Sequence, residues 1–320
     1  MSLPLQAEVW KRLLSGEPLD GLSLLVKAGR IDLSGFRLPE PRVVSRWQAR
    51  LADVTEVEAD RIFRRVRWRD LDFSGSTLNS LQFYDSEITN CCFDRCRLGD
   101  FQPFATTIRD SSFRGADLRG AGLGIATESG PLKLRRNIYN GIDFTDADLR
   151  QTLYISASFE HCTFRNSKLA KLNFASSTFS DCRFEGELRE VRFWRSDLPT
   201  CPWFPQDAFP PNEMTNVDFS HAKLRDVEFR GINLERVRLP VNKDHIIIHN
   251  FAATLDKVID CLKKEGDETA RILLASLEVH RSGAAPYSPG VLNRLDLAEA
   301  GDGAVERVLR LLSQFETKVQ

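Results

Sequence analysis

The sequence lacks the features that mark several large classes of protein. None of the apolar stretches among its 320 residues approaches the roughly 18 residues of a membrane-spanning helix. The formal net charge is only -1, which favours neither direct nucleic-acid binding nor attachment to a membrane surface. The opening segment "MSLPLQAEVWKRLL" has no secretory apolar region and no cleavage site. We therefore expect a cytoplasmic protein.

Catalytic motifs are also missing, since the sequence holds no P-loop, nucleophile elbow or dinucleotide fingerprint. His245 and His249 flank three isoleucines in "HIIIHN", which favour a strand, and no acidic residue lies at metal-site spacing. Asp143, Asp146 and Asp148 lack the glycine and terminal glutamate of a calcium loop and are expected at solvated corners. The sequence therefore predicts a protein that is not an enzyme, with no catalytic residue, metal site or cofactor.

What the sequence has instead is a period of five. A large apolar residue recurs at every fifth position between residues 61 and 239, and the residue two places before it is mostly small. This period is neither that of a helix nor that of a strand. One unit, between Phe184 and Leu188, is a residue short. The predicted centres are Phe63, Trp68, Phe73, Leu78, Phe83, Ile88, Phe93, Leu98, Ile108, Phe113, Leu118, Leu123, Tyr139, Phe144, Leu149, Tyr154, Phe159, Phe164, Leu169, Phe174, Phe179, Phe184, Leu188, Phe193, Leu198, Trp203, Phe219, Leu224, Phe229, Leu234 and Leu239.

The segments "GADLRGAGL", "TDADLRQTL" and "SHAKLRDVEFRGINL" resemble the A(D/N)LXX consensus of the pentapeptide-repeat family. The resemblance implies a right-handed quadrilateral parallel β-helix, an all-β solenoid in which each side is one pentapeptide and each coil has about twenty residues. Identical residues twenty positions apart, as at Phe73, Phe93 and Phe113, support this independently, because such residues would stack. Pro103 falls on a centre, and either it kinks the coil or Phe104 takes its inward place.

The two ends of the repeat are predicted to be α-helical caps, because an open solenoid exposes strand edges and core. Residues 1–60 read as an N-terminal helical cap that includes a stray repeat pair centred on Leu33 and Leu38. Residues 240–320 read as a C-terminal helical region. It has helices expected at Phe251–Lys264, Asp267–Arg281 and Gly303–Phe315, and enough surface to hold a second copy or a partner.

The seven cysteines do not form a convincing metal set, because no CxxC pair accompanies them. Five of them occupy the small inward position, where cysteine acts as a compact apolar residue: Cys91, Cys96, Cys162, Cys182 and Cys201. The repeat predicts that the last three form one column of free, buried thiols.

Two insertions interrupt the repeat and are the candidate partner-binding sites. The insertion near 124–138 carries Lys133, Arg135 and Arg136, and the one near 199–213 carries Trp203, Phe204 and Phe209. Two plainer interpretations stay open. The basic residues would form a solvated loop, and the aromatic residues would fold back over the coil.

The family resemblance implies a function for the surface. Some pentapeptide-repeat proteins mimic duplex DNA and bind bacterial DNA gyrase or topoisomerase IV, protecting the enzyme from quinolones or peptide poisons and so conferring antibiotic resistance. Such mimicry needs an acidic stripe, yet residues 61–240 hold about 26 Lys and Arg against about 24 Asp and Glu. We therefore expect a scaffold that binds another protein. The alternatives are an immunity, effector or regulatory adaptor unrelated to topoisomerase, or an enzyme in the C-terminal region. A continuous acidic face would favour topoisomerase, and a patchwork of charge an adaptor.

Overall fold

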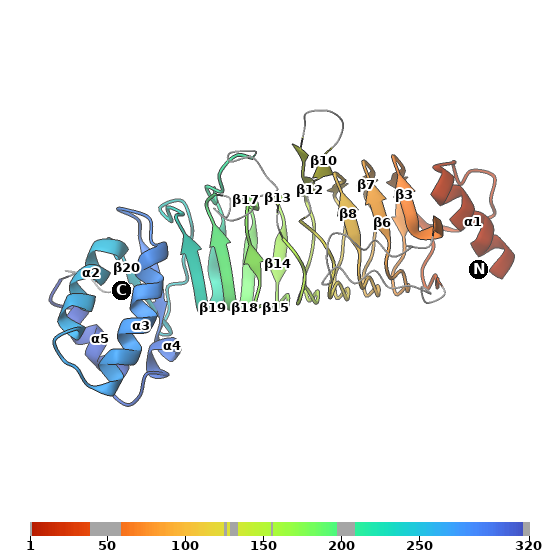
Figure 1. Ribbon diagram of the computed structural model, residues 1–320. Helices are drawn as coiled ribbons and strands as arrows, with labels where there is room; N and C mark the ends of the chain where they lie inside the picture. The colour runs from red at the N-terminus through yellow and green to blue at the C-terminus, as the bar shows by residue number, and fades with distance from the viewer. Residues whose placement is uncertain are drawn as a thin grey trace. The chain divides into compact units, whose positions relative to one another are not determined.

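The computed structural model describes residues 2–38, 59–124, 127–128, 134–154, 156–196 and 209–315. The chain divides into two compact units, Met1–Leu172 and Asn173–Gln320. The first unit begins with a helix and continues as a series of short strands, and the second begins with strands and ends in helices (Figure 1). The sequence-based division at residues 60 and 239 marks where the repeat begins and ends, and it stays a prediction.

The first unit contains one α-helix, a 3-10 turn and short strands of two to four residues. These elements are α1 (Leu3–Ser15), β1 (Val26–Lys27), β2 (Arg30–Asp32), η1 (Ala59–Arg61), β3 (Ile62–Arg64), β4 (Arg67–Arg69), β5 (Leu71–Asp72), β6 (Gln82–Tyr84), β7 (Glu87–Thr89), β8 (Gln102–Phe104), β9 (Thr107–Arg109), β10 (Thr127–Glu128), β11 (Leu134–Arg135), β12 (Asn137–Asn140), β13 (Ala157–Glu160), β14 (Thr163–Arg165) and β15 (Leu169–Ala170).

Strand pairing in the first unit follows the predicted coil length. Phe63 pairs with Phe83 and Ile88 with Ile108, in parallel and twenty residues apart. The predicted coil length of twenty residues is confirmed. The strands are short because the chain turns after each pentapeptide, where residues such as Asp70 and Asn90 adopt a positive φ of 55° and 52°. Asn and Asp tolerate this conformation better than most side chains.

The interior of the first unit is a set of stacked apolar side chains. In one column of five phenylalanine rings, the centroids of successive rings are 5.7, 4.9, 5.6 and 5.1 Å apart. Each of these residues is at most 1% exposed. The column consists of Phe73, Phe93, Phe113, Phe144 and Phe164. The column continues across the first insertion because Ile108 pairs with Tyr139, thirty-one residues later.

Pro103 keeps the central inward position, and a large residue at the neighbouring small position, Phe101, fills the space beside it. Phe104 does not move inward. Pro103 pairs with Phe83 on the inner wall. Phe101, at the position that is usually small, is 1% exposed, and its ring centroid lies 5.8 Å from that of Phe83. Phe104 faces outward, where its ring stacks on Tyr84 with centroids 4.6 Å apart. A large residue at the small position thus compensates for a small centre.

The start of the first unit packs on the first coil through aromatic contacts. The Trp10 ring of α1 lies 5.3 Å from Phe63 and 6.1 Å from Trp68, and its Nε1 donates to the Asp60 carbonyl at 2.9 Å. The stray pair is buried, with Leu33 1% and Leu38 9% exposed. The helix expected around Val43 to Val54 lies outside the described residues. Capping by this region stays a prediction.

Within its described residues, the second unit contains the long strands β18 and β19, the short strands β16 and β17, one antiparallel pair, β20 and β21, and four α-helices. The elements are β16 (Asn173–Phe174), β17 (Thr178–Ser180), β18 (Arg183–Trp194), β19 (Asp218–Arg230), β20 (His245–Ile248), α2 (Phe251–Leu262), α3 (Glu268–Gly283), β21 (Gly290–Asn293), α4 (Arg294–Ala298) and α5 (Ala304–Leu312). The three predicted C-terminal helices correspond to α2, α3 and α5. The antiparallel pair β20 and β21 and the short α4 were not predicted, apart from the strand expected within "HIIIHN".

The register of β18 and β19 relates the two sides of the second insertion. Phe193 pairs with Phe229, and Ser180 bridges Thr215, so Met214 supplies the next side of the coil after Phe193. Leu198 and Trp203 lie outside the described residues. The short unit ending at Leu188 is confirmed by a register shift between Arg183 and Glu185.

The same register corrects the predicted cysteine column. Arg183 pairs with Asp218, so the residue beside Cys182 on the next coil is Val217. Cys201 lies outside the described residues. Six described cysteines are free, and five of them are buried. Burial raises the pKa of Cys91 and of Cys96 to about 12, as expected for poorly reactive thiols in a core.

Candidate functional site

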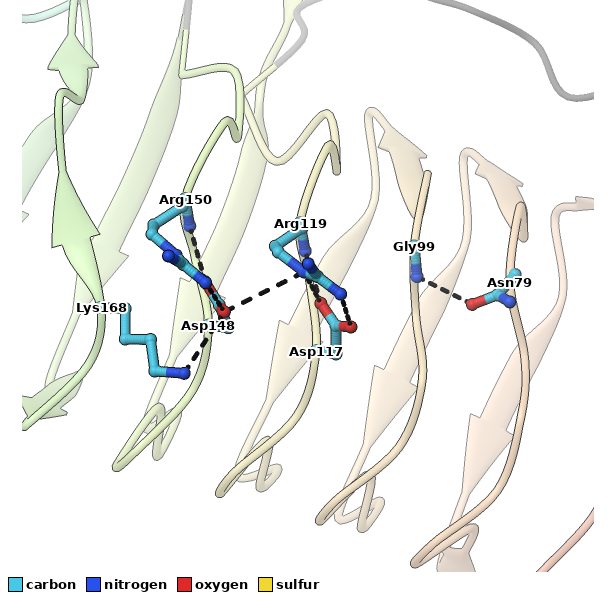
Figure 2. Close-up of polar contacts among 7 residues, drawn as sticks. All are labelled: Asn79, Gly99, Asp117, Arg119, Asp148, Arg150 and Lys168. Carbon is cyan, nitrogen blue, oxygen red and sulfur yellow. Dashed lines mark hydrogen bonds and ion pairs between the residues drawn. The ribbon is translucent and has the colours of Figure 1, made fainter.

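One side of the coil in the first unit carries an ordered set of charged residues. Isolated parallel bridges join Thr77 to Arg97, Arg97 to Asp117, Asp117 to Asp148, and Asp148 to Lys168. These residues precede the inward leucines of successive coils, and Arg119 and Arg150 follow two of those leucines. We call Asp117, Arg119, Asp148, Arg150 and Lys168 the Asp–Arg ladder (Figure 2).

Two Asp-Leu-Arg segments form the centre of the ladder. Because strand residues two apart point to the same face, each leucine is buried while its flanking Asp and Arg meet outside. Arg119 donates from Nε and Nη2 to the two carboxylate oxygens of Asp117 at 2.8 and 2.7 Å. Arg150 contacts Asp148 in the same way at 2.8 and 2.6 Å. Such bidentate pairs fix the orientation of the guanidinium group.

Asp148 also joins neighbouring coils. Its Oδ2 lies 3.5 Å from Lys168 Nζ and 4.0 Å from Arg119 Nε, so one carboxylate contacts cations on three successive coils. Asp148 is 9% exposed as a residue. The expectation that it lies at a solvated corner is therefore wrong, because three cations surround it.

The electrostatics keep both ladder carboxylates charged at neutral pH. Hydrogen bonds from Arg119 lower the pKa of Asp117 below its ordinary value. Burial raises the pKa of Asp148, but the hydrogen bonds from Arg150 and the charges of Arg150 and Lys168 outweigh it and the pKa is lowered. These pairs therefore stabilise the fold above the ordinary carboxyl pKa and lose their effect as pH falls through the lowered pKa.

Towards its N-terminal end this side carries Thr77 and Asn79, and Arg37 on the preceding coil pairs with Thr77. Asn79 Oδ1 accepts the Gly99 N–H at 3.0 Å, and a Cβ at Gly99 would lie 3.4 Å from that oxygen (Figure 2). Arg97 follows on the next coil and is exposed. This side of the coil thus has two Asp–Arg pairs with a basic residue before and after them, Arg97 and Lys168.

The other sides of the first unit also mix both charges. Arg67, Arg69, Glu87, Arg109 and Asp110 lie on or beside the strands β4, β7 and β9. On the side that holds Asp143, its carboxylate pairs with Arg114 at 2.8 Å. No side of the coil is continuously acidic among the residues of the first unit that the structure describes. The surface is a patchwork of charge.

The residues predicted to bind a partner are only partly placed by the structure. Arg135 Nη1 lies 3.1 Å from Asp85 Oδ1, so this arginine pairs with an earlier coil. Arg136 and Phe209 are each partly buried. Lys133, Trp203 and Phe204 lie outside the described residues.

Sequence reasoning missed the ladder, although the repeated "ADLR" at residues 116–119 and 147–150 was a usable signal. Charged outward residues in a repeat are usually solvated singly, which makes such a signal weak. The insertion also hid the alignment, because it places Asp117 and Asp148 thirty-one residues apart in the sequence.

The second unit has a small cavity, but its size suits water and not a substrate. The cavity is about 30 Å³ and is lined in part by Glu228, His280 and Ser288. Glu228 is 4% exposed, and its Oε1 accepts from Arg192 Nε at 2.7 Å. Burial lowers the pKa of His280.

His245 has a structural role in the same unit. Its Nε2 accepts the Leu224 N–H at 3.0 Å, which ties β20 to β19. Among the described residues, no three His, Cys, Asp or Glu side chains are placed to hold a metal ion. In the same part of the chain, every helix is too short or too polar to cross a bilayer.

Comparison with known proteins agrees with the repeat. A family model described as pentapeptide repeats matches eight copies over residues 142–186 and 213–239. The chain is 31% identical over 100 residues to a pentapeptide repeat protein, MfpA, from Mycobacterium tuberculosis. The aligned segment covers 30% of this chain and 52% of that protein. The chain thus spans about half the length of the curated relative it matches.

Solved structures of similar proteins include QnrB1, described as a plasmid-mediated fluoroquinolone resistance protein, with a TM-score of 0.32 and 16% identity over 66% of this chain and 90% of that one. HetL from Nostoc, described as involved in the regulation of heterocyst differentiation, gives a TM-score of 0.23 and 15% identity over 56% of this chain and 83% of that one. The family match, the five-residue period and the twenty-residue register agree that this chain carries the repeats of the pentapeptide-repeat family.

Proposed function

We propose that this protein is a non-catalytic scaffold that binds another protein through the exterior of a right-handed, four-sided coil with capped ends. The proposal rests on the separate roles of inward and outward positions within each pentapeptide. Stacked apolar side chains fill the interior, as in the column from Phe73 to Phe164. Polar recognition is left to outward columns, whose side chains the coil holds in a regular array.

DNA gyrase or topoisomerase IV is the first named partner to test. Support comes from the resemblance to a family in which some proteins bind these enzymes as DNA mimics and protect them from poisons. The patchwork of charge on the first unit weighs against mimicry along a whole face, because a DNA mimic needs a continuous run of negative charge.

A regulatory, immunity or effector adaptor is the second candidate, and the Asp–Arg ladder favours it. A surface of paired opposite charges recognises a partner with a matching pattern and rejects others by like-charge contacts. A duplex DNA surface has no such alternation. The charge pattern therefore fits an adaptor better than a DNA mimic.

The insertions remain proposed contact segments. Lys133, Arg135 and Arg136 in the first and Trp203, Phe204 and Phe209 in the second supply charge and aromatic area, the side chains that partner surfaces often use. The pair between Arg135 and Asp85 holds the base of the first insertion against the coil. Action in the cytoplasm without a cofactor is part of the same proposal. A homodimer through the C-terminal helices has no support in the comparisons.

Purified gyrase offers a direct test. The protein would be added at micromolar concentration to gyrase from the source organism in supercoiling and quinolone-induced cleavage assays. The topoisomerase hypothesis expects weaker supercoiling or fewer cleavage complexes, with nothing added beyond the requirements of gyrase itself. No change in either assay would remove gyrase as the partner and leave the adaptor.

A further inference from the structure

We propose that the ladder side of the first unit is a docking surface for an acidic α-helix of a partner protein. This inference rests on the proposed scaffold function and names the chemistry of its partner. Four cations, Arg97, Arg119, Arg150 and Lys168, share this side with two ladder carboxylates, those of Asp117 and Asp148. The side therefore has an excess of positive charge.

The cations stand outside the carboxylates. The side chains of Arg119, Arg150 and Lys168 are 54%, 46% and 59% exposed, whereas those of Asp117 and Asp148 are 33% and 12% exposed. A partner that approaches this side meets guanidinium and ammonium groups first. Its own acidic side chains would therefore be attracted and not repelled.

The two arginines are oriented before any partner arrives. Each uses Nε and Nη2 to hold its own aspartate, which leaves the Nη1 N–H groups for a second acceptor. An arginine fixed in this way loses less side-chain freedom on binding than a free one. Lys168 adds a charge on the next coil, so the donors form a row along the coil axis (Figure 2).

The spacing of this row matches a helix better than it matches an irregular loop. Paired strands lie about 4.8 Å apart, so the donors repeat at about that distance. Along an α-helix, residues three and four apart rise by about 4.5 and 6 Å on one face. Glutamates at those positions would meet successive coils.

A nucleic acid fits this side less well. Phosphate binding depends on uncompensated basic residues, and here two carboxylates lie within the row. Single strands also need aromatic side chains on which bases stack, and the outward columns of this side hold none between Thr77 and Ala170. The described residues therefore favour an acidic protein segment.

Fluorescence anisotropy with synthetic peptides tests the inference on the full chain. The probe is a capped peptide of about 20 residues with glutamates at i, i+3, i+4 and i+7, long enough to form helix. The comparison peptide carries glutamine at the same positions, and a single-stranded DNA of similar length is the third probe. The double variant Arg150→Gln, Lys168→Gln removes two row donors. Arg67→Gln, Arg109→Gln changes the net charge equally on another side.

We expect the glutamate peptide to bind about tenfold more tightly than the glutamine peptide, and the ladder variant to lose most of that difference while the control variant keeps it. Equal losses in both variants, tighter binding of the DNA, or no preference for glutamate would each overturn the inference. The gyrase assay reports separately on the proposed function. A positive result there, unchanged by the ladder variant, would leave the scaffold standing and remove the ladder from its binding surface.

Discussion

Both insertions return to the coil at a buried asparagine, but the two asparagines make different numbers of hydrogen bonds. Each ends at an asparagine in the small inward position, Asn137 in the first unit and Asn212 in the second, where other coils place Ser, Ala or Cys. Both are buried, at 0% and 1% exposure. An amide at this position can satisfy the backbone groups that the departing chain leaves unpaired.

Asn137 satisfies more groups than Asn212. Its Oδ1 accepts the Thr106 N–H at 3.0 Å, and its Nδ2 donates to the carbonyls of Pro103 and Leu123 at 2.7 and 3.0 Å. Serines such as Ser111 play the accepting part elsewhere, taking the N–H of Cys91 at 3.0 Å. The first insertion therefore closes with three side-chain hydrogen bonds.

Among the described residues, the Asn212 side chain accepts hydrogen bonds but donates none. Its Oδ1 takes the N–H groups of Phe179 and Met214 at 3.1 and 3.3 Å, and its Nδ2 has no hydrogen-bond partner among the described residues. A buried donor without a partner is costly. The comparison shows that the repeat accommodates an insertion at both places. The closing asparagine stabilises the second insertion less than the first.

The largest predicted effect comes from removing the better anchor. Asn137→Ala should leave the buried Thr106 N–H and the buried Pro103 carbonyl without their side-chain partner, while the Leu123 carbonyl keeps the hydrogen bond that it accepts from the Tyr139 hydroxyl at 2.7 Å. The expected loss of stability is about 3 kcal/mol. Asn140 lies on the same strand but faces outward, bonding Glu160 at 2.9 Å, so Asn140→Ala is the matched control. Urea unfolding followed by circular dichroism would measure both. Equal losses would mean that Asn137 does not close the insertion.

Asn212→Ala should cost less, about 1 to 2 kcal/mol, because two N–H groups lose an acceptor while the unpartnered Nδ2 is removed. Asn216→Gly is its control, since Asn216 bonds Asp181 at 3.1 Å on the exposed surface and glycine tolerates its positive φ of 56°. The same unfolding experiment applies. A loss at Asn212 as large as that at Asn137 would erase the difference between the two insertions.

Much of this architecture follows from the sequence, because each coil side must place one large and one small residue inside. Spacing alone did not reveal that Met214 supplies the side of the coil after Phe193, because the two residues are twenty-one positions apart and only strand pairing relates them. Only contacts between residues far apart in sequence reveal such a choice. The ladder was missed for a related reason, because an insertion of unknown length hides which coils lie together.

Charge pairs also join the coils on either side of each insertion, and the stability that the Asp–Arg ladder contributes depends on pH. Asp117 and Asp148 lie before and after the first insertion, and across the second Lys223 Nζ lies 3.8 Å from Glu187 Oε2. Because the pKa of Asp148 is lowered, its contribution is present at neutral pH and lost in acid.

Asp148→Asn should therefore cost at most about 1 kcal/mol near pH 7 and still less below the lowered pKa. Thermal unfolding between neutral pH and acid would follow this difference. Glu187→Gln serves as the comparison. A cost for Asp148→Asn that does not shrink in acid would assign the role of Asp148 to packing instead of charge.

The smallest effect is expected at the surface pair that ties the first insertion to an earlier coil. Arg135 and Asp85 are 52% and 32% exposed, so screening by water limits their contribution to about 0.2 to 1 kcal/mol. Arg135→Ala should hardly change global unfolding. It should instead speed amide hydrogen exchange in β10 and β11, whose hairpin pairs Thr127 with Arg135, and added salt should do the same to the wild type. Exchange in β12 is the internal control, because Asn137 anchors that strand independently. If exchange in the hairpin is unchanged by the substitution and by salt, the pair does not hold the insertion, and Asn137 alone accounts for its closure.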